Sequence, residues 1–178
     1  MRSVIVLFIC FLSLQIRSQV LETRYAIETT FDDKTPVAYE ANYGSLSINS
    51  TSGDLVFYTD LADLKTGDKI TDSLLVEAEK IPFTFSCNLS QGLFGIINEE
   101  NDDTYHKVLG AIIVNGTIYP AEAYVRINNL SDKSDIGKAL LDFKLEVNPS
   151  VVNIPILSSY FKNTISFLVI DGVINQNQ

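Results

Sequence analysis

Short runs of alternating apolar and polar residues, each bounded by Gly, Asn, Asp or Pro, recur along most of this chain. Strict alternation puts successive side chains on opposite faces of a strand, so these runs predict half-buried β-strands. The clearest run is Ile81–Ser86, which places Ile81, Phe83 and Phe85 on one face. Helical periodicity is nearly absent, and no internal repeat is visible. An all-β fold is therefore expected.

Turn signals separate these runs. Asn115-Gly116 is the strongest, because both central residues of a two-residue hairpin need positive φ. The Gly-containing loop Asn49–Gly53 predicts another hairpin, and an acidic loop at Asn98–Asp103 suggests a third. The strands expected around these turns and beyond them are Tyr25–Thr30, Gly44–Asn49, Asp54–Thr59, Ile81–Ser86, Gly92–Ile97, Val108–Val114, Thr117–Ile127, Ala139–Val147, Val151–Leu157 and Thr164–Ile174.

Many strands linked by tight turns, with no intervening helices, predict an antiparallel sandwich or a closed barrel. A closed antiparallel β-barrel of about eight strands is the preferred prediction, because closure removes exposed strand edges. The polar stretch Leu61–Glu79, interrupted by Gly67, is expected to be a loop with one or two short helical turns. Residues 19–178 should form one domain, since about 160 residues suffice for a single core.

The N-terminal segment 1–18 resembles a secretory signal peptide. Arg2 precedes an apolar run, Val4–Leu14, and a polar exit ends at Ser18. An apolar stretch of about 7–15 residues with such flanks is typical of an export signal, whereas a membrane span needs about 20. A short membrane anchor is the alternative. The expected location is secreted or periplasmic, with no membrane span in the mature chain.

Charge and cysteine content narrow the range of partners. Loss of the signal removes Arg2 and Arg17, so 13 basic residues become 11 against 22 acidic ones. Such a surface repels the phosphate backbone, and no nucleic-acid partner is expected. Only Cys87 remains, so no disulfide can form within the chain. Cys87 is expected to be a small buried hydrophobe beside Phe85.

Residues that carry enzyme chemistry are scarce. The single histidine, His106, and the single mature cysteine exclude the common zinc sites, and no nucleophile elbow, P-loop or dinucleotide fingerprint is present. The carboxylates of the acidic loop lack EF-hand spacing, so a solvated loop is expected there in place of a calcium site. No catalytic residue, metal or cofactor is predicted, and the chain is expected not to be an enzyme.

Three stretches, in this order, resemble the YceI-like family of secreted lipid-binding barrels. The first runs from Gly44-Ser45-Leu46 through Leu55-Val56-Phe57 to a linker ending Thr71-Asp72-Ser73-Leu74-Leu75. The second is Ile81–Ser86, similar to that family's Pro- and Phe-containing strand. The third is Leu109–Pro120, with Gly110, Gly116, Thr117 and Pro120 in matching places. The family's early histidine and its late Arg-containing strand have no counterpart here, so no ligand contact is transferred.

The resemblance implies a lipocalin-like barrel that holds a long apolar or amphipathic molecule, such as an isoprenoid or a fatty acyl chain. Tyr58, Tyr119 and Tyr124 are candidates to orient such a ligand. The aromatic residues expected to line the cavity are Phe57, Phe83, Phe85, Tyr119, Phe143 and Phe167.

Other interpretations stay open at this level. The same aromatic residues would equally well fill a solid core, because small barrels either pack their interior or leave room for one ligand. The chain could instead be a β-sandwich interaction module that binds protein or glycan on its surface. An enzyme on a similar barrel would need His106 or a carboxylate pointing into a cavity. The sequence does not decide between a monomer and a homodimer.

Overall fold

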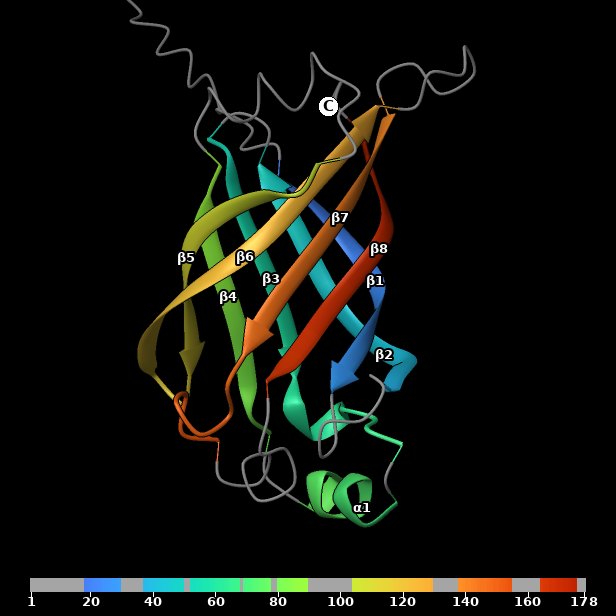
Figure 1. The fold of residues 1–178 in the computed structure, drawn as a ribbon, viewed down its shortest axis with the longest axis vertical. Coiled ribbons are helices and arrows are strands. Elements are labelled where there is room, and N and C mark those ends of the chain that lie inside the picture. The colour runs from blue at the N-terminus through green and yellow to red at the C-terminus, as the bar shows by residue number, and fades with distance from the viewer. Residues whose placement is uncertain are drawn as a thin grey trace, which may run out of the picture.

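The chain folds into a closed barrel of eight antiparallel strands in simple up-and-down order, β1 to β8 (Figure 1). The structure is a computed structural model, and it describes residues 18–29, 37–49, 52–67, 69–77, 80–89, 104–129, 138–154 and 164–175. The strands and helices are β1 (Ser18–Thr29), β2 (Val37–Asn49), β3 (Asp54–Asp60), the 3-10 helix η1 (Leu61–Asp63), α1 (Lys69–Glu77), β4 (Pro82–Asn88), β5 (His106–Val114), β6 (Thr117–Asn129), β7 (Lys138–Val147) and β8 (Ile165–Asn175).

Strand β1 closes the barrel because it pairs with β2 along one edge and with β8 along the other. The Ile27–Phe167 pair marks this closure. The prediction of an all-β, eight-stranded closed barrel is therefore confirmed, and the sandwich is excluded. The expected signal segment lies outside the described residues, apart from Ser18 at the start of β1. Within the described ranges, no helix has the length and apolar character needed to cross a membrane.

Local sequence explains two of the hairpins. Asn115 and Gly116 have φ values of 49° and 74°, and they connect β5 to β6 directly after the Val114–Thr117 pair. Gly53, at φ 76°, ends the β2–β3 loop, where its amide donates to Asn49 O at 2.8 Å. Left-handed backbone of this kind favours Asn and Gly over other residues.

The segment between β3 and β4 closes one end of the barrel (Figure 1). It holds a nine-residue helix, α1, which is more regular structure than the expected loop with short turns. Leu61, Leu64 and Leu75 are fully buried and belong to the main core. Asp60 caps η1, since its Oδ1 accepts hydrogen bonds from Ala62 N at 3.0 Å and Ile81 N at 3.1 Å.

One strand prediction is wrong over part of its length, and another lies outside the described residues. Val151–Asn153 form a turn, so the strand expected at Val151–Leu157 is wrong over its first residues. Asn148 starts this turn, because its side chain accepts from Ser150 N and its carbonyl accepts from Val151 N and Val152 N. The strand expected at Gly92–Ile97 and the acidic loop after it lie outside the described residues. Within the described residues, β4 pairs with β5 between Gly110 and Val114.

Candidate functional site

Five of the six residues expected to line a cavity lie together inside the barrel. Their rings contact one another, with centroids 5.4 Å apart for Phe57 and Phe143, 5.0 Å for Phe83 and Phe167, and 5.6 Å for Phe85 and Phe143. None of the five is more than 1% exposed. The sixth, Tyr119, is half-buried near the start of β6 and packs against the edge of the core.

These ring contacts show how the middle of the barrel is filled. A ligand-sized chamber would leave solvent-accessible surface on its walls, yet the rings at this level have almost none. Offset and tilted ring pairs at such distances are the packing that aromatic cores prefer. In this structure the five phenylalanines pack as a solid core, and a ligand among them would have to separate the rings.

The polar side chain at the centre of this core is Tyr25, which is 2% exposed. Its hydroxyl lies 2.7 Å from the Thr59 hydroxyl, which in turn donates to Tyr43 O at 3.4 Å. Burial raises the pKa of the Tyr25 phenol far above its ordinary value, so Tyr25 stays neutral. The interpretation of Tyr58 and Tyr124 as interior orienting groups is wrong, since they alternate with buried neighbours and face outward.

Cys87 and His106, the thiol and the imidazole that an enzyme could use as nucleophile and base, do not form a catalytic pair in the described structure. Cys87 is buried, as expected, and burial raises the pKa of its thiol to about 12. A thiol that stays protonated at neutral pH is a poor nucleophile. His106 is half-buried at the start of β5. Among the residues that the structure describes, no group of three or more His, Cys, Asp or Glu is placed to hold a metal ion.

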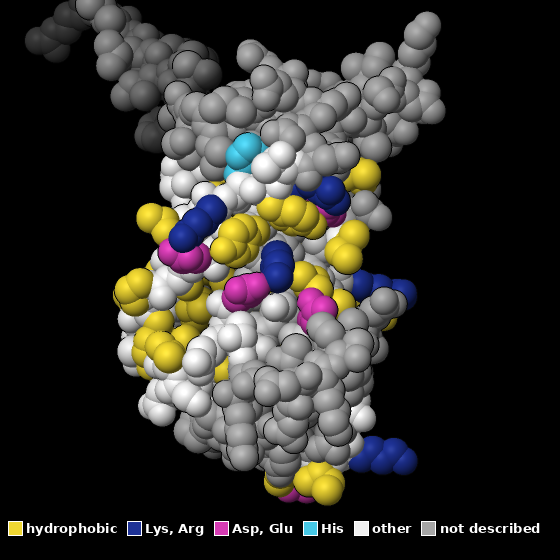
Figure 2. All heavy atoms as spheres, in the orientation of Figure 1, with side chains coloured by type: hydrophobic (Ala, Val, Ile, Leu, Met, Phe, Trp, Pro, Cys, Tyr) yellow, Lys and Arg dark blue, Asp and Glu magenta, His cyan; other side chains and the backbone are white. Residues whose placement is uncertain are grey.

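Two hollows in the barrel wall adjoin each other at Tyr124 and Glu146, which line both, and the pair is here called the outer groove. The larger hollow has a volume of about 560 Å³ and the smaller about 260 Å³. Figure 2 shows hydrophobic and charged side chains gathered over β6, β7 and β8 on this face. Those that the argument uses are Tyr105, Glu122, Tyr124, Lys144, Glu146, Leu168 and Ile170.

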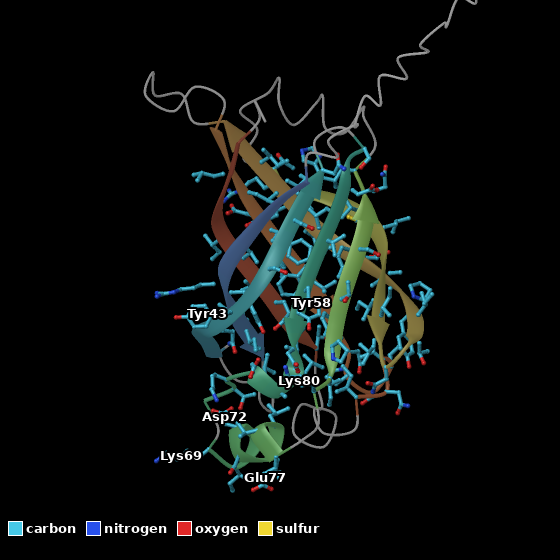
Figure 3. All side chains as sticks on the ribbon, turned by 180° about the vertical axis from the view of Figure 1, so that it is seen from behind. Tyr43, Tyr58, Lys69, Asp72, Glu77 and Lys80 are labelled. Carbon is cyan, nitrogen blue, oxygen red and sulfur yellow. The ribbon has the colours of Figure 1, made fainter. Side chains whose placement is uncertain are left out.

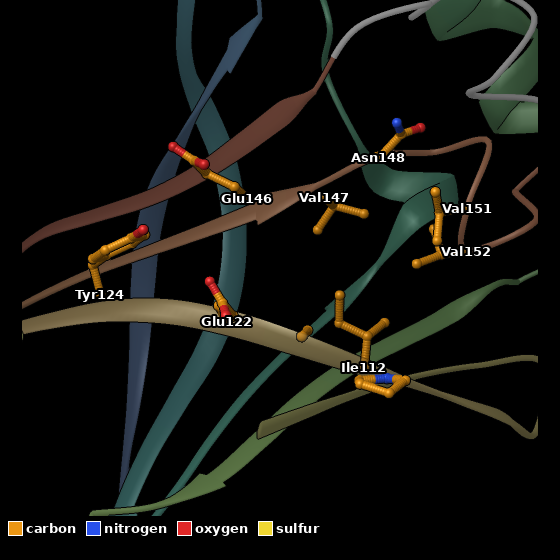
Figure 4. Close-up of a pocket in the computed structure, with 10 residues that line it drawn as sticks. Ile112, Glu122, Tyr124, Glu146, Val147, Asn148, Val151 and Val152 are labelled. Carbon is orange, nitrogen blue, oxygen red and sulfur yellow. The ribbon is translucent and has the colours of Figure 1, made fainter. Parts of the chain in front are cut away.

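Apolar side chains occupy the two ends of the outer groove. Figure 4 shows Ile112, Val147, Val151 and Val152 at the end of the smaller hollow, away from Tyr124. At the other end, Leu168 and Ile170 of β8 lie with Tyr105, and Ile170 is 61% exposed. An apolar part of a ligand could therefore contact apolar wall at either end of the groove.

Charged side chains occupy the middle of the outer groove. Glu122 and Glu146 stand one residue beyond the paired Ala123 and Leu145, so two carboxylates lie at neighbouring positions (Figure 4). Lys107 donates to Glu122 at 2.6 Å, and Lys144 donates to Glu146 at 2.7 Å. These hydrogen bonds raise the pKa of both lysines. The middle of the groove therefore carries paired charges of both signs.

A β-bulge lies under the larger hollow. Leu141 pairs with Gly172 and Phe143 with Val169, so one residue of β7 faces two of β8 between these pairs. Phe143 and Val169, although inward-facing, also line the hollow at this point. Bulges often re-aim side chains next to binding sites. The bulge gives the outer groove a floor that reaches the aromatic core at Phe143.

An ion pair supports the wall beside Tyr105. Arg126 Nε donates to Asp142 at 2.9 Å, and the Asp142 side chain is only 3% exposed. The Arg126 guanidinium lies 4.9 Å from the centroid of the Tyr105 ring. Cation–π contact and a buried ion pair both restrict side-chain motion, so Tyr105 is held over the groove.

Sequence reasoning missed the outer groove but contained a signal for it. The run Ile165–Ile170 is apolar at nearly every position, although one face of β8 is already covered by the core. Leu168 and Ile170 therefore had to lie outside. No local pattern shows that Tyr105 and Tyr124 lie beside Leu168 and Ile170, because this depends on the register between strands.

No protein-family model matches this chain, and no curated protein matches its sequence.

Proposed function

We propose that this barrel is an exported, non-enzymatic binding protein for a lipid-like, amphipathic small molecule, and that it binds this ligand in the outer groove. The observation that carries the proposal is the larger hollow, whose volume of about 560 Å³ is lined by Tyr105, Leu168 and Ile170 next to the charged Lys144 and Glu146. Ligand sites are typically hollows of about 300–1,000 Å³ with mostly apolar walls and a few polar groups.

The groove is favoured over the interior because of what binding would cost. Ligand in the interior would need the packed rings of Phe57, Phe143 and Phe167 to separate, which loses their contacts. Ligand in the groove needs no such change, and it covers Ile170, which is 61% exposed. Burying exposed apolar surface contributes about 25 cal/mol for each Å² removed from water.

The charges of the groove indicate the polar end of the ligand. Glu28, Glu122 and Glu146 line it with Lys144, and Lys107 pairs with Glu122, so three carboxylates face two ammonium groups. The whole chain also has a formal net charge of −9. A free carboxylate or phosphate would be repelled, so the ligand carries an uncharged or cationic polar end.

Binding of twelve-carbon amphiphiles that differ only in their polar ends tests the proposal. The probes are glycerol monododecanoate, dodecyltrimethylammonium and dodecanoate, each titrated into residues 19–178 below its critical micelle concentration. Isothermal titration calorimetry should detect the first two and find dodecanoate weaker by about tenfold or more, a difference of about 1.4 kcal/mol.

Variants of exposed groove residues locate the site. Ile170→Ser and Tyr124→Ala should weaken binding of glycerol monododecanoate, whereas Tyr43→Ala, on the outer face of β2, should not. Absence of binding by all three amphiphiles, or binding that Ile170→Ser and Tyr124→Ala leave unchanged, would reject the outer groove as the site. Export is tested separately, by sequencing the N-terminus of protein secreted by a host cell and finding it near Gln19.

A second candidate function, surface interaction, has one observation in its favour. Ile113 and Ile118 form a cross-strand pair on the outer faces of β5 and β6, where Ile118 is 67% exposed, and Leu109, 71% exposed, lies on the same face of β5. Contiguous exposed apolar residues are typical of protein contacts. If this patch joins two copies of the chain, sedimentation equilibrium should find a dimer, and Leu109→Ser with Ile118→Ser should return it to a monomer.

A further inference from the structure

A third hollow, of about 490 Å³, lies on the outer faces of β2 and β3, away from the outer groove. Tyr43 and Tyr58 stand over it from neighbouring strands, and Lys80 lies beside it where the chain returns from α1 to β4 (Figure 3). Tyr43 is 66% exposed and Tyr58 is 43% exposed. These two tyrosines present aromatic surface and hydroxyl groups to solvent on one face of the barrel.

Gly44 lines this hollow with its backbone. A Cβ added there would point into the barrel, 2.7 Å from Tyr58 O, 3.2 Å from the Tyr25 ring and 3.4 Å from the Phe57 ring. The missing side chain therefore makes room for the core rings on the inner face of β2, while Tyr43 and Tyr58 face outward.

Buried hydrogen bonds hold the walls of the hollow in place. Asn42, 1% exposed, donates to Lys65 O at 3.1 Å and accepts from Lys65 N at 2.6 Å, which fastens the segment after η1 to β2. Thr59 donates to Tyr43 O at 3.4 Å. The Arg24 guanidinium lies 5.5 Å from the centroid of the Tyr43 ring. The site is therefore preorganised, which reduces the entropy lost on binding.

The polar groups of the hollow combine acceptors and donors. Asp60 and Asp63 supply carboxylates, Lys80 an ammonium and Ser45 a hydroxyl. The two hydrogen bonds that Asp60 accepts, from Ala62 N and Ile81 N, both end on its Oδ1 atom. Carboxylates accept from hydroxyl groups and lysine donates to them, while the apolar face of a sugar ring stacks on tyrosine. The two carboxylates outnumber the ammonium, which disfavours an anionic ligand.

We infer that this hollow is a binding site for a neutral saccharide, with its ring stacked on Tyr43 and Tyr58 and its hydroxyl groups bonded to Asp60, Asp63 and Lys80. It is independent of the outer groove, because the two share no lining residue. Single sugars bound on exposed platforms are held weakly, with dissociation constants of about millimolar.

Saturation-transfer NMR on the purified protein tests this inference with glucose, galactose, mannose and their neutral disaccharides as probes. At least one should receive saturation from the protein, and Tyr43→Ala and Tyr58→Ala should each reduce its affinity about tenfold. Tyr105→Ala is the matched control, since Tyr105 is 44% exposed in the outer groove and Tyr58 is 43% exposed. Asp63→Asn should weaken binding with the fold intact.

Three results would overturn the inference. One is no saturation transfer to any of these sugars. Another is transfer that Tyr43→Ala and Tyr58→Ala leave unchanged, and the third is transfer lost equally in Tyr105→Ala. Circular dichroism melting of each variant separates lost binding from lost folding, and Asp63→Asn keeps the test valid should a tyrosine variant unfold. Amphiphile binding in the outer groove should be unaffected by Tyr43→Ala, so the two proposals fail separately.

Discussion

The hydroxyl of Tyr25 on β1 reaches the hydroxyl of Thr59 on β3, 2.7 Å away, across the intervening strand β2. Gly44 of β2 permits this contact, because a Cβ added there would lie 3.2 Å from the Tyr25 ring. Thr59 donates to Tyr43 O, so Tyr25 donates to Thr59. Two hydrogen bonds in series, from Tyr25 to Thr59 and from Thr59 to Tyr43 O, thus link the aromatic core to the strand that carries Tyr43.

Removal of the Thr59 hydroxyl should leave the Tyr25 phenol buried without a partner. Thr59→Val is therefore expected to lower the free energy of unfolding by about 1–3 kcal/mol. Tyr25→Phe should cost less, because Thr59 keeps its bond to Tyr43 O. Urea unfolding of both variants and of the double variant measures this, and a double variant that costs the sum of the two single ones would contradict the coupling.

Alkaline pH should destabilise the barrel. The folded pKa of Cys87 is about 12, above the ordinary 9.0, and that of Tyr25 is raised above 10.0. The unfolded chain therefore loses these protons first, so stability is fully present below about pH 9 and falls as the pH rises above it. Cys87→Ala should move the onset of this fall from about pH 9 to about pH 10. An unchanged onset in urea titrations would contradict the assignment to Cys87.

Two glycines should respond differently to alanine. A Cβ at Gly110 would lie 2.4 Å from Ser86 O and 2.7 Å from the Phe85 ring, so Gly110→Ala forces β4 and β5 apart. At Gly116 nothing lies within 4 Å, and only its φ of 74° opposes a side chain. Expected costs in thermal or urea unfolding are about 3 kcal/mol for Gly110→Ala and about 1 kcal/mol for Gly116→Ala. The reverse order would show that β4 and β5 are not packed this closely.

Replacing only one partner of the Arg126–Asp142 ion pair should lower the stability of the barrel more than replacing both. Arg126→Met removes the guanidinium that donates to the Asp142 carboxylate, which is 3% exposed, and about 3–5 kcal/mol of stability should be lost. Arg126→Met combined with Asp142→Leu should recover much of that loss. Chemical denaturation of the three proteins measures it, and a double variant no more stable than Arg126→Met would indicate that Asp142 is satisfied by other groups.

Much of the barrel follows from local sequence. The alternation in Ile81–Ser86 fixes which face of β4 is buried, and Asn115-Gly116 fixes the β5–β6 register. The turn at Val151–Asn153 was beyond local reasoning, because Val152 and Ile154 are as apolar as strand residues and become buried through the turn that Asn148 initiates. Apolar character alone does not distinguish these outcomes.

The candidate sites were harder to predict than the fold. Whether Phe57 and Phe143 line a chamber or touch each other depends on distances across the barrel, which no run of residues encodes. Likewise, Tyr124 was expected inside and lies outside, because the parity of β6 is set by Ala123 and Val125. The groove needs the bulge between Leu141 and Phe143, a property of β7 and β8 together.

Chemical-shift mapping most directly tests whether an amphipathic ligand binds on the outer wall. Residues 19–178, labelled with ¹⁵N and with ¹³C methyl groups, would be titrated with glycerol monododecanoate. The predicted result is that the largest shifts occur at Tyr124, Leu168 and Ile170, with small shifts at the ring-packed Phe57 and Phe83. Large shifts at Phe57 and Phe83, with none at Ile170, would place the ligand inside the barrel and contradict the proposed site.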